Sequence, residues 1–189
     1  MDNPELLIVA GPNGCGKTTL AKEYLAGSNF HYLSADDIAA QISPGDPQKA
    51  SIIAARKFAS ILEESLPEKQ SWVIESTLAG LTVKRWLANA KNLGYKITIA
   101  FVFLDSVELC LDRISTRVAN GGHDVPEEDI RRRFPRSIHN FWYTYRTMAD
   151  HWSLFYNTEE SCRQIAFGEN AVHKVLDRDI FNKWQGLIA

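Results

Sequence analysis

One glycine-rich stretch near the start of the chain has the residue types and the spacing for holding a phosphate. It reads GPNGCGKTT and satisfies the pattern G-x-x-x-x-G-K-[ST]. Glycines let the backbone wrap so that its N–H groups point inward at a phosphate. In this pattern Lys17 reaches the β- and γ-phosphates of a nucleotide, and the Thr18 hydroxyl is a ligand of Mg²⁺. We therefore expect a nucleotide-binding loop made of Gly11, Pro12, Asn13, Gly14, Cys15, Gly16, Lys17, Thr18 and Thr19.

Two features of this loop need interpretation. Cys15 lies near the expected start of a helix, where the pKa of a thiol can be lowered, but we favour the simpler view that a small residue is needed there. A GTPase usually carries an Asn-Lys-x-Asp element that reads guanine. The Asn-Lys pair at Asn182 has no aspartate in place. We therefore expect ATP, together with Mg²⁺, as the nucleotide.

Acidic residues follow two of the expected strands. Asp36 and Asp37 come after residues 31–33, and Glu75 ends residues 72–75. Ligands of an open parallel sheet lie outside the carboxyl ends of its strands. The spacing does not decide whether one aspartate orients an acceptor hydroxyl or whether it caps the next helix. A carboxylate at the end of a buried run needs a partner, so Glu75 should meet Mg²⁺ through water or a substrate hydroxyl.

The segment RVANGGHDVPEEDIRRRFPRS, residues 117–137, concentrates arginine. Gly121 and Gly122 end one helix, and Pro126 with the acids after it starts another. Four arginines follow within about two turns: Arg131, Arg132, Arg133 and Arg136. One interpretation is a mobile lid that brings guanidinium groups to a transferred phosphoryl group, and we favour it.

The alternative for the same arginines is ion pairing along the helix, for example Asp129 with Arg133 or Glu128 with Arg132. Such exposed pairs contribute only about 0.3–0.5 kcal/mol each. His123, beside the glycines, is equally suited to a hinge contact, a phosphate contact or a surface position.

Buried-strand patterns alternate with helical ones along the chain. We expect strands at residues 5–10, 31–33, 72–75, 97–104 and 153–156, with a weaker sixth at 163–167. One helix should cover residues 52–66, and another should start with Asp105 and Glu108 as a capping pair. The aromatic residues near position 145 fall at helical spacing, which favours burial over a base-stacking platform. The alternation predicts an α/β protein whose parallel sheet is covered on both faces, as a single domain over residues 1–189.

Composition excludes several classes of function. The formal net charge of −2 gives no general attraction to nucleic acid or to an anionic membrane, so neither is an expected partner. The three cysteines, Cys15, Cys110 and Cys162, have no metal-ligand spacing, which favours reduced thiols. The N-terminus does not read as a signal peptide, and no run approaches the ~18 apolar residues of a membrane helix. We expect a cytoplasmic protein.

Together these motifs resemble the zeta-toxin family of P-loop kinases. The matching segments are GPNGCGKTT, SADDIA, IEST and RVANGGHDVPEEDIRRRFPRS, the last being the most specific. The resemblance covers about residues 6–157. Ser34 stands where relatives carry asparagine, and FYN at residues 155–157 replaces a more usual Asp-Asn ending. The resemblance to this family implies a three-layer αβα P-loop NTPase of the kinase type. Its core sheet would be parallel, with the order 2-3-1-4-5, and an arginine-bearing helical lid would lie at about residues 117–137.

The resemblance also implies an activity, the transfer of a phosphoryl group from ATP to a hydroxyl of a small molecule such as UDP-N-acetylglucosamine. It implies an antitoxin protein as a partner. Carried onto this sequence, Asp36 is the base, and Glu75 and Thr77 lie on the substrate side. The catalytic set would be Asp36, Lys17, Arg117, Arg132 and Arg133. Two other functions stay open: a kinase of another acceptor, such as an antibiotic or a nucleoside, and an ATP-binding regulatory module that transfers nothing.

Overall fold

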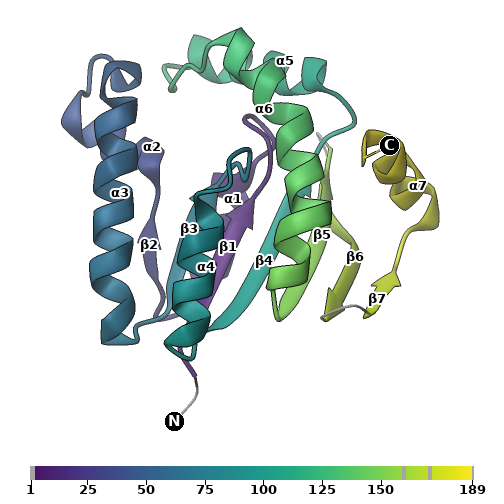
Figure 1. Ribbon diagram of the computed structural model, residues 1–189. Helices are drawn as coiled ribbons and strands as arrows, with labels where there is room; N and C mark the ends of the chain where they lie inside the picture. Colours follow the sequence, from purple (N-terminus) through teal and green to yellow (C-terminus); the bar gives the residue numbers. More distant parts are fainter. Residues whose placement is uncertain (1–2, 159–160, 170–171, 189) are drawn as a thin grey trace.

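A single mixed β-sheet forms the centre of the computed structural model, which describes residues 3–158, 161–169 and 172–188 (Figure 1). In the described residues its strands lie in the order β2-β3-β1-β4-β5-β6-β7. Their bounds are Glu5–Ala10 (β1), His31–Leu33 (β2), Trp72–Ser76 (β3), Lys96–Phe103 (β4), His151–Asn157 (β5), Cys162–Glu169 (β6) and Val172–Val175 (β7).

The first five strands are parallel, whereas β6 and β7 pair antiparallel with their neighbours. The expectation of a purely parallel sheet of order 2-3-1-4-5 is therefore wrong, because two antiparallel strands extend that order, and the first of them, β6, overlaps the weaker strand expected at residues 163–167. The physical reason is chain length, because a parallel connection needs a crossover of a dozen or more residues. Residues 158–161 and 170–171 are too few for one, so each of these strands reverses direction.

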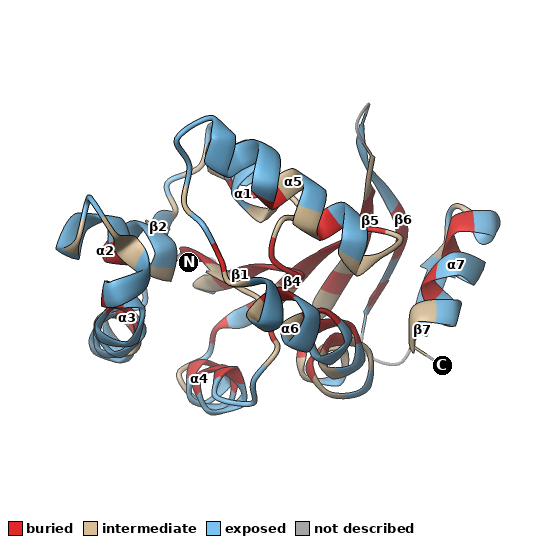
Figure 2. Ribbon diagram, turned by 90° about the horizontal axis from the view of Figure 1, so that it is seen from above, coloured by how far each residue is buried: buried red, intermediate tan, exposed pale blue. Residues whose placement is uncertain are grey.

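Helices cover both faces of the sheet, which gives an α/β fold in three layers. Seen from above, α1 and α5 lie on one face and α4 and α6 on the other, with α2 and α3 at the β2 end (Figure 2). The bounds of the α-helices are Lys17–Leu25 (α1), Ala35–Ile42 (α2), Ser51–Ser65 (α3), Val83–Asn92 (α4), Val107–Ala119 (α5), Glu127–Asn140 (α6) and Arg178–Ile188 (α7). Short 3₁₀ turns at Pro47–Ala50, Leu66–Glu68 and Arg146–Met148 and a π-helical turn at Phe141–Tyr145 complete the connections.

The core lies along β1 and β4, which are covered on both faces and therefore read as continuous apolar runs. The last helix completes this core through Trp184 of α7, whose ring packs 5.5 Å from that of Phe101 and 4.9 Å from that of Phe103. Of the aromatic residues near position 145, Phe141 and Tyr145 are fully buried, and Trp142 is partly buried against the core, so they pack inward as expected.

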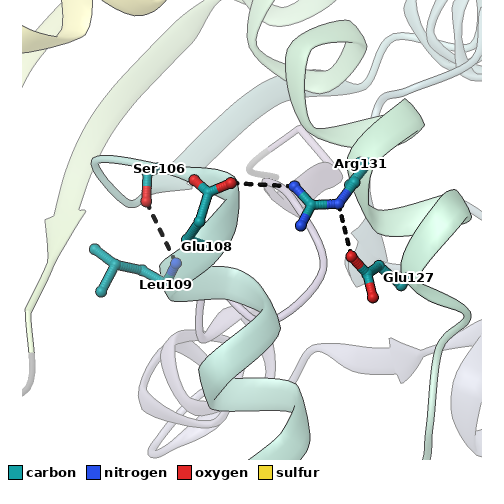
Figure 3. A network of polar contacts seen from close by, with 5 residues as sticks. All are labelled: Ser106, Glu108, Leu109, Glu127 and Arg131. Carbon is teal, nitrogen blue, oxygen red and sulfur yellow. Dashed lines mark hydrogen bonds and ion pairs between the residues drawn. The ribbon is translucent and has the colours of Figure 1, made fainter.

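The start of α5 differs from the expected capping pair. Ser106 caps this helix, since its side chain accepts from the backbone N–H of Leu109 at 3.3 Å. Its extended backbone is the usual conformation of a capping residue. Asp105 instead accepts a hydrogen bond from the Tyr156 hydroxyl. Glu108 meets Arg131 of α6 at 3.1 Å, so the acid ties two helices together (Figure 3).

In the part of the chain that the structure describes, none of the helices has the length and apolar character needed to cross a membrane.

Candidate functional site

The glycine-rich loop joins the end of β1 to the start of α1 in a backbone conformation that only glycine adopts without strain. Gly11, Gly14 and Gly16 all have positive φ, at 142°, 80° and 99°. L-residues with side chains rarely adopt such values. A Cβ on Gly11 would also lie 2.1 Å from the carbonyl oxygen of Val102 in β4. The glycines are therefore required by the path of the loop, which is the strand–loop–helix context that the motif predicts.

Two side chains of this loop and its helix contact nearby oxygens. The Lys17 ammonium donates to the carbonyl oxygen of Pro12 at 2.8 Å. The Thr18 hydroxyl donates to the Glu75 carboxylate at 3.1 Å, and the Tyr32 hydroxyl donates to its other oxygen at 2.5 Å. Burial, followed by the Glu75 carboxylate, raises the pKa of Tyr32 above its usual value, so Tyr32 remains a donor at neutral pH. Glu75 thus has protein partners at the end of β3.

The oxygens beside the loop fit a magnesium ion held mainly by a nucleotide. Across residues 3–158, 161–169 and 172–188, no group of three or more His, Cys, Asp or Glu side chains gathers to hold a metal. Mg²⁺ at a phosphate site needs only one or two protein ligands, because phosphates and water supply the others. Thr18 would be the direct ligand, and Glu75, 3.1 Å from it, would hold a bound water.

Three cavities meet around the loop. The loop cavity, of about 280 Å³, is lined by glycine-loop residues together with Asp36, Glu75, Arg113 and Arg117. The helix cavity, of about 510 Å³, lies among residues of α2, α3 and α4. The strand cavity, of about 730 Å³, is lined by the end of β5 and by α5.

The loop cavity shares lining residues with both of the others. Asn13, Lys17, Asp36 and Glu75 line the loop and helix cavities, and Gly16, Thr19 and Arg113 line the loop and strand cavities. The three cavities are therefore consecutive, with the loop in the middle. The Oδ1 atom of Asn13 is buried and has no hydrogen-bond partner in the described residues. An acceptor atom left without a partner is costly unless a ligand or water satisfies it.

The structure separates the two aspartates of α2. Ser34 caps this helix, since its hydroxyl accepts from the backbone N–H of Asp37 at 3.4 Å, so neither aspartate is the cap. Asp36 is exposed and lines both the loop and helix cavities, whereas Asp37 lines neither. Burial, and then the neighbouring Asp36 charge, raise the pKa of Asp37. The side chain at the junction of the cavities is Asp36.

The arginines of α6 point to different surroundings. Arg131 is held by Glu127 at 2.8 Å and by Glu108 of α5 at 3.1 Å (Figure 3). Arg132 pairs with Asp129 and lines none of the three cavities. Arg133 also pairs with Asp129, at 2.9 Å, and lines the helix cavity. The expected Asp129–Arg133 pair is present, and Arg132 takes Asp129 rather than Glu128 as its partner.

Much of the segment 117–137 is part of the packed body of the protein. Ile130 and Phe134 of α6 are buried, and the Ser137 hydroxyl donates to the carbonyl oxygen of Thr77. The Asn140 side chain donates to the carbonyl oxygen of Leu78 at 2.8 Å. These contacts fix the second half of α6 to the end of β3. The connection between α5 and α6 is mostly exposed, apart from the buried Val125, and the outward faces of both helices are exposed as well.

Three more of the predicted residues line cavities, and Cys15 is buried. Thr77 and His123 line the helix cavity, and Arg117 lines the loop cavity. Cys15 is fully buried, and burial raises the pKa of its thiol, so the structure supports the simple interpretation of a small residue in the loop.

Sequence reasoning missed three residues of the site. Arg113 lines both the loop and strand cavities. It precedes Arg117 by four positions, which places the two on the same face of α5, and this spacing was the signal for it. The Tyr32 hydroxyl holds Glu75. Asn157, the last residue of β5, donates to the carbonyl oxygen of Cys15 at 2.8 Å, a position that its place at a strand end would suggest.

Known proteins share both sequence and fold with this chain. Residues 6–134 match the model of a family described as an AAA domain. An uncharacterized protein of Haemophilus influenzae strain Rd is 30% identical over 128 residues, which is 68% of this chain and 91% of that protein.

Three solved structures show the fold at lower identity. The AvrRxo1-ORF1:-ORF2 complex with ATP has a TM-score of 0.73 at 18% identity, over 96% of this chain and 63% of that one. The PezAT chromosomal toxin–antitoxin system of Streptococcus pneumoniae gives 0.62 at 17%, over 86% and 71%. A Chloroflexus aurantiacus protein provisionally named a kinase gives 0.57 at 22%, over 69% and 79%. This chain spans less than two thirds of the AvrRxo1 chain. The fold is P-loop kinase-like.

Proposed function

We propose, since this chain belongs to the AAA domain family and has a P-loop kinase-like fold, that it transfers the γ-phosphoryl group of ATP to a hydroxyl of a small molecule. The observation that carries this proposal is the row of three cavities with shared walls. A nucleotide needs room for a base and for a triphosphate, and a transferase needs a further space for the acceptor. A protein that only binds ATP needs no third cavity that shares a carboxylate with the phosphate site.

In this proposal the base of ATP occupies the strand cavity and its phosphates occupy the loop cavity. Lys17 would leave the Pro12 carbonyl and bind the β- and γ-phosphates, as in other loops with this motif. Mg²⁺ supplies charge neutralisation between those phosphates. Thr18 would be its protein ligand, with Glu75 behind it. The unpartnered Asn13 oxygen lines the boundary with the helix cavity, where a bound acceptor could donate to it.

In this proposal Asp36 is the general base. The acceptor oxygen would form a bond to the γ-phosphorus as the bond from that phosphorus to the bridging oxygen breaks, and ADP leaves. The hydroxyl proton would pass to the Asp36 carboxylate, which lines both cavities. Arg117 in the loop cavity and Arg133 in the helix cavity would stabilise the charge that spreads over the transferred group.

The zeta-toxin resemblance adds finer proposals, namely UDP-N-acetylglucosamine as the acceptor and an antitoxin as the partner. The PezAT structure belongs to a toxin–antitoxin system, and that description applies to PezAT. For this chain we treat the UDP-sugar as one member of an acceptor panel and the antitoxin as a separate hypothesis.

The test measures ADP release from ATP and Mg²⁺ by the purified chain while UDP-sugars, nucleosides, free sugars and aminoglycosides are added in turn. We expect one acceptor class to raise the rate and to gain a phosphate by mass spectrometry. Lys17→Ala should lower ATP affinity more than tenfold, because a charged contact to phosphate exceeds 1.4 kcal/mol. Lys22→Ala is the matched control, since Lys22 is an exposed lysine of the same helix that lines none of the three cavities.

Retention of ATP affinity within about twofold by Lys17→Ala would contradict the proposed nucleotide site. Lysine-dependent ATP binding with no phosphorylated product would favour the regulatory module instead.

A further inference from the structure

The lining of the helix cavity divides by charge. The carboxylates Asp36 and Glu75 and the ammonium of Lys17 come from α2, β3 and the glycine loop, where this cavity meets the loop cavity. The residues from α3, from α4 and from the connection that precedes α4 are all neutral. They are Ser51, Ala55, Phe58, Thr77, Leu78, Gly80, Thr82, Val83 and Trp86.

Two aromatic side chains form the apolar part of this wall. The rings of Phe58 and Trp86 lie 5.4 Å apart, and these residues are 4% and 8% exposed. The indole N–H of Trp86 donates to Glu63 at 3.2 Å, and Glu63 does not line the cavity. The one polar group of the indole is therefore already used elsewhere. A ligand in the cavity would meet carbon atoms of Trp86, which suits an apolar ring face.

The cations of the cavity are poorly placed for a second phosphorylated molecule. Lys17 belongs to the nucleotide site, and in the proposed function Arg133 serves the transferred phosphoryl group. His123 comes from the connection between α5 and α6. The neutral wall offers no lysine or arginine, which are the side chains that usually bind phosphate groups. A diphosphate against this wall would therefore find no cationic side chain of the wall to bind it.

We infer, resting on the proposed function, that the acceptor is an uncharged, ring-containing molecule of the sugar or nucleoside type. Its ring lies against Phe58 and Trp86, the hydroxyls of Ser51 and Thr82 hydrogen-bond its polar edge, and its reacting hydroxyl lies at Asp36. The cavity volume of 510 Å³ is within the range of small-molecule sites. Nucleoside diphosphate sugars do not match this wall.

The first experiment needs no knowledge of the acceptor. A bacterial small-molecule extract is passed over an anion exchanger and then a cation exchanger, which gives an unretained, uncharged fraction and a retained, anionic fraction eluted from the first column. Each is incubated with the full chain, Mg²⁺ and ATP labelled in the γ-phosphate. We expect label transfer to the unretained fraction at least tenfold above the retained one. Equal or greater transfer to the retained fraction overturns the inference and leaves the kinase standing. Transfer to neither overturns the proposed kinase function, and the inference falls with it.

The second experiment tests the aromatic wall. Trp86→Leu should raise the KM for the labelled acceptor at least tenfold and leave the KM for ATP within twofold. Trp72→Leu is the matched control, because Trp72 is also 8% exposed and lines none of the three cavities. A KM change no larger in Trp86→Leu than in Trp72→Leu overturns the inference.

If Trp86→Leu does not fold, a surface variant tests the same wall of the cavity. Thr82 is exposed and lines the cavity, so Thr82→Lys should be tolerated. The added ammonium supplies the missing phosphate partner, and we expect transfer to the retained fraction to rise at least fivefold. An unchanged preference in Thr82→Lys would mean that charge on this wall does not select the acceptor, which contradicts the inference.

Discussion

Asp36→Asn should abolish phosphoryl transfer and leave the fold and ATP binding almost unchanged. The substitution keeps the size of the side chain and removes the charge that would take the hydroxyl proton. Asp36 lies in the first turn of α2, after the cap at Ser34, so the helix cap is not affected. Loss of a general base typically lowers the rate by about 10²–10⁴-fold. We expect a loss of that order in turnover at saturating ATP and acceptor.

The cost to stability can be bounded from the same geometry. A carboxylate in the first turn of an exposed helix gains about 0.3–1 kcal/mol from the helix dipole. For a chain of this length, 1 kcal/mol corresponds to roughly 2–4 °C in Tm. Repulsion from Asp37 offsets part of this gain, since the Asp36 charge contributes to the raised pKa of Asp37. The melting temperature should therefore fall by less than about 4 °C.

Asp37→Asn is the matched control, because it makes the same chemical change one position along the same helix. Asp37 lines none of the three cavities. Its raised folded-state pKa means that ionising it costs stability, so removing the charge at neutral pH should not destabilise the protein. Transfer should stay within about threefold of wild type. The measurements are thermal melting, ATP titration and product formation by mass spectrometry. Normal transfer in Asp36→Asn, or an equal loss in both variants, would refute the assignment of the base.

Three further predictions concern neighbouring residues. Arg133→Ala should lower turnover on the order of a hundredfold, by analogy with other phosphoryl-transfer arginines. The control Arg131→Ala, away from the cavities, should lower the free energy of urea unfolding by under about 1 kcal/mol and leave turnover intact. Equal effects of the two variants on turnover would contradict this prediction. Tyr32→Phe removes the hydroxyl that donates to Glu75. Hydrogen bonds to charged groups contribute about 1.5–3 kcal/mol, so steady-state turnover should fall at least tenfold. Wild-type turnover in this variant would show that Glu75 does not need the Tyr32 hydrogen bond. Cys162 is exposed, but partial desolvation of its thiol, and then the nearby Glu23 charge, raise its pKa to about 11. The thiol therefore stays protonated, and iodoacetamide labelling should be slow at pH 7.5 and accelerate towards pH 10. Fast labelling at neutral pH would disprove the shift.

Local sequence patterns predicted the elements whose conformation depends on residues close to them in the chain. The glycine loop needs positive φ at fixed positions, and the spacing of its glycines in the sequence indicates those positions. The central strands β1 and β4 read as apolar runs because both of their faces are covered. The short strand β7 could not be recognised in this way, since most of its side chains are exposed. The cap of α5 was misplaced by one residue because Asp105 and Ser106 are both good capping residues, and the choice depends on the Tyr156 hydroxyl that engages Asp105.

The roles of the consecutive arginines could not be predicted, because neighbouring residues on a helix point about 100° apart and the sequence does not give the rotation of the helix. Packing decides it here. Burial of Ile130 and Phe134 fixes the rotation of α6. With that face inward, Arg131 reaches the acid of α5 and Arg133 reaches the helix cavity. In the proposed function, acceptor specificity follows the same logic, because the neutral wall of that cavity comes from α3, α4 and the connection before α4, and their packing beside the loop decides what fits there. A change of acceptor within this fold should therefore require substitutions on α3, on α4 or in the connection that precedes α4, and none in the glycine loop.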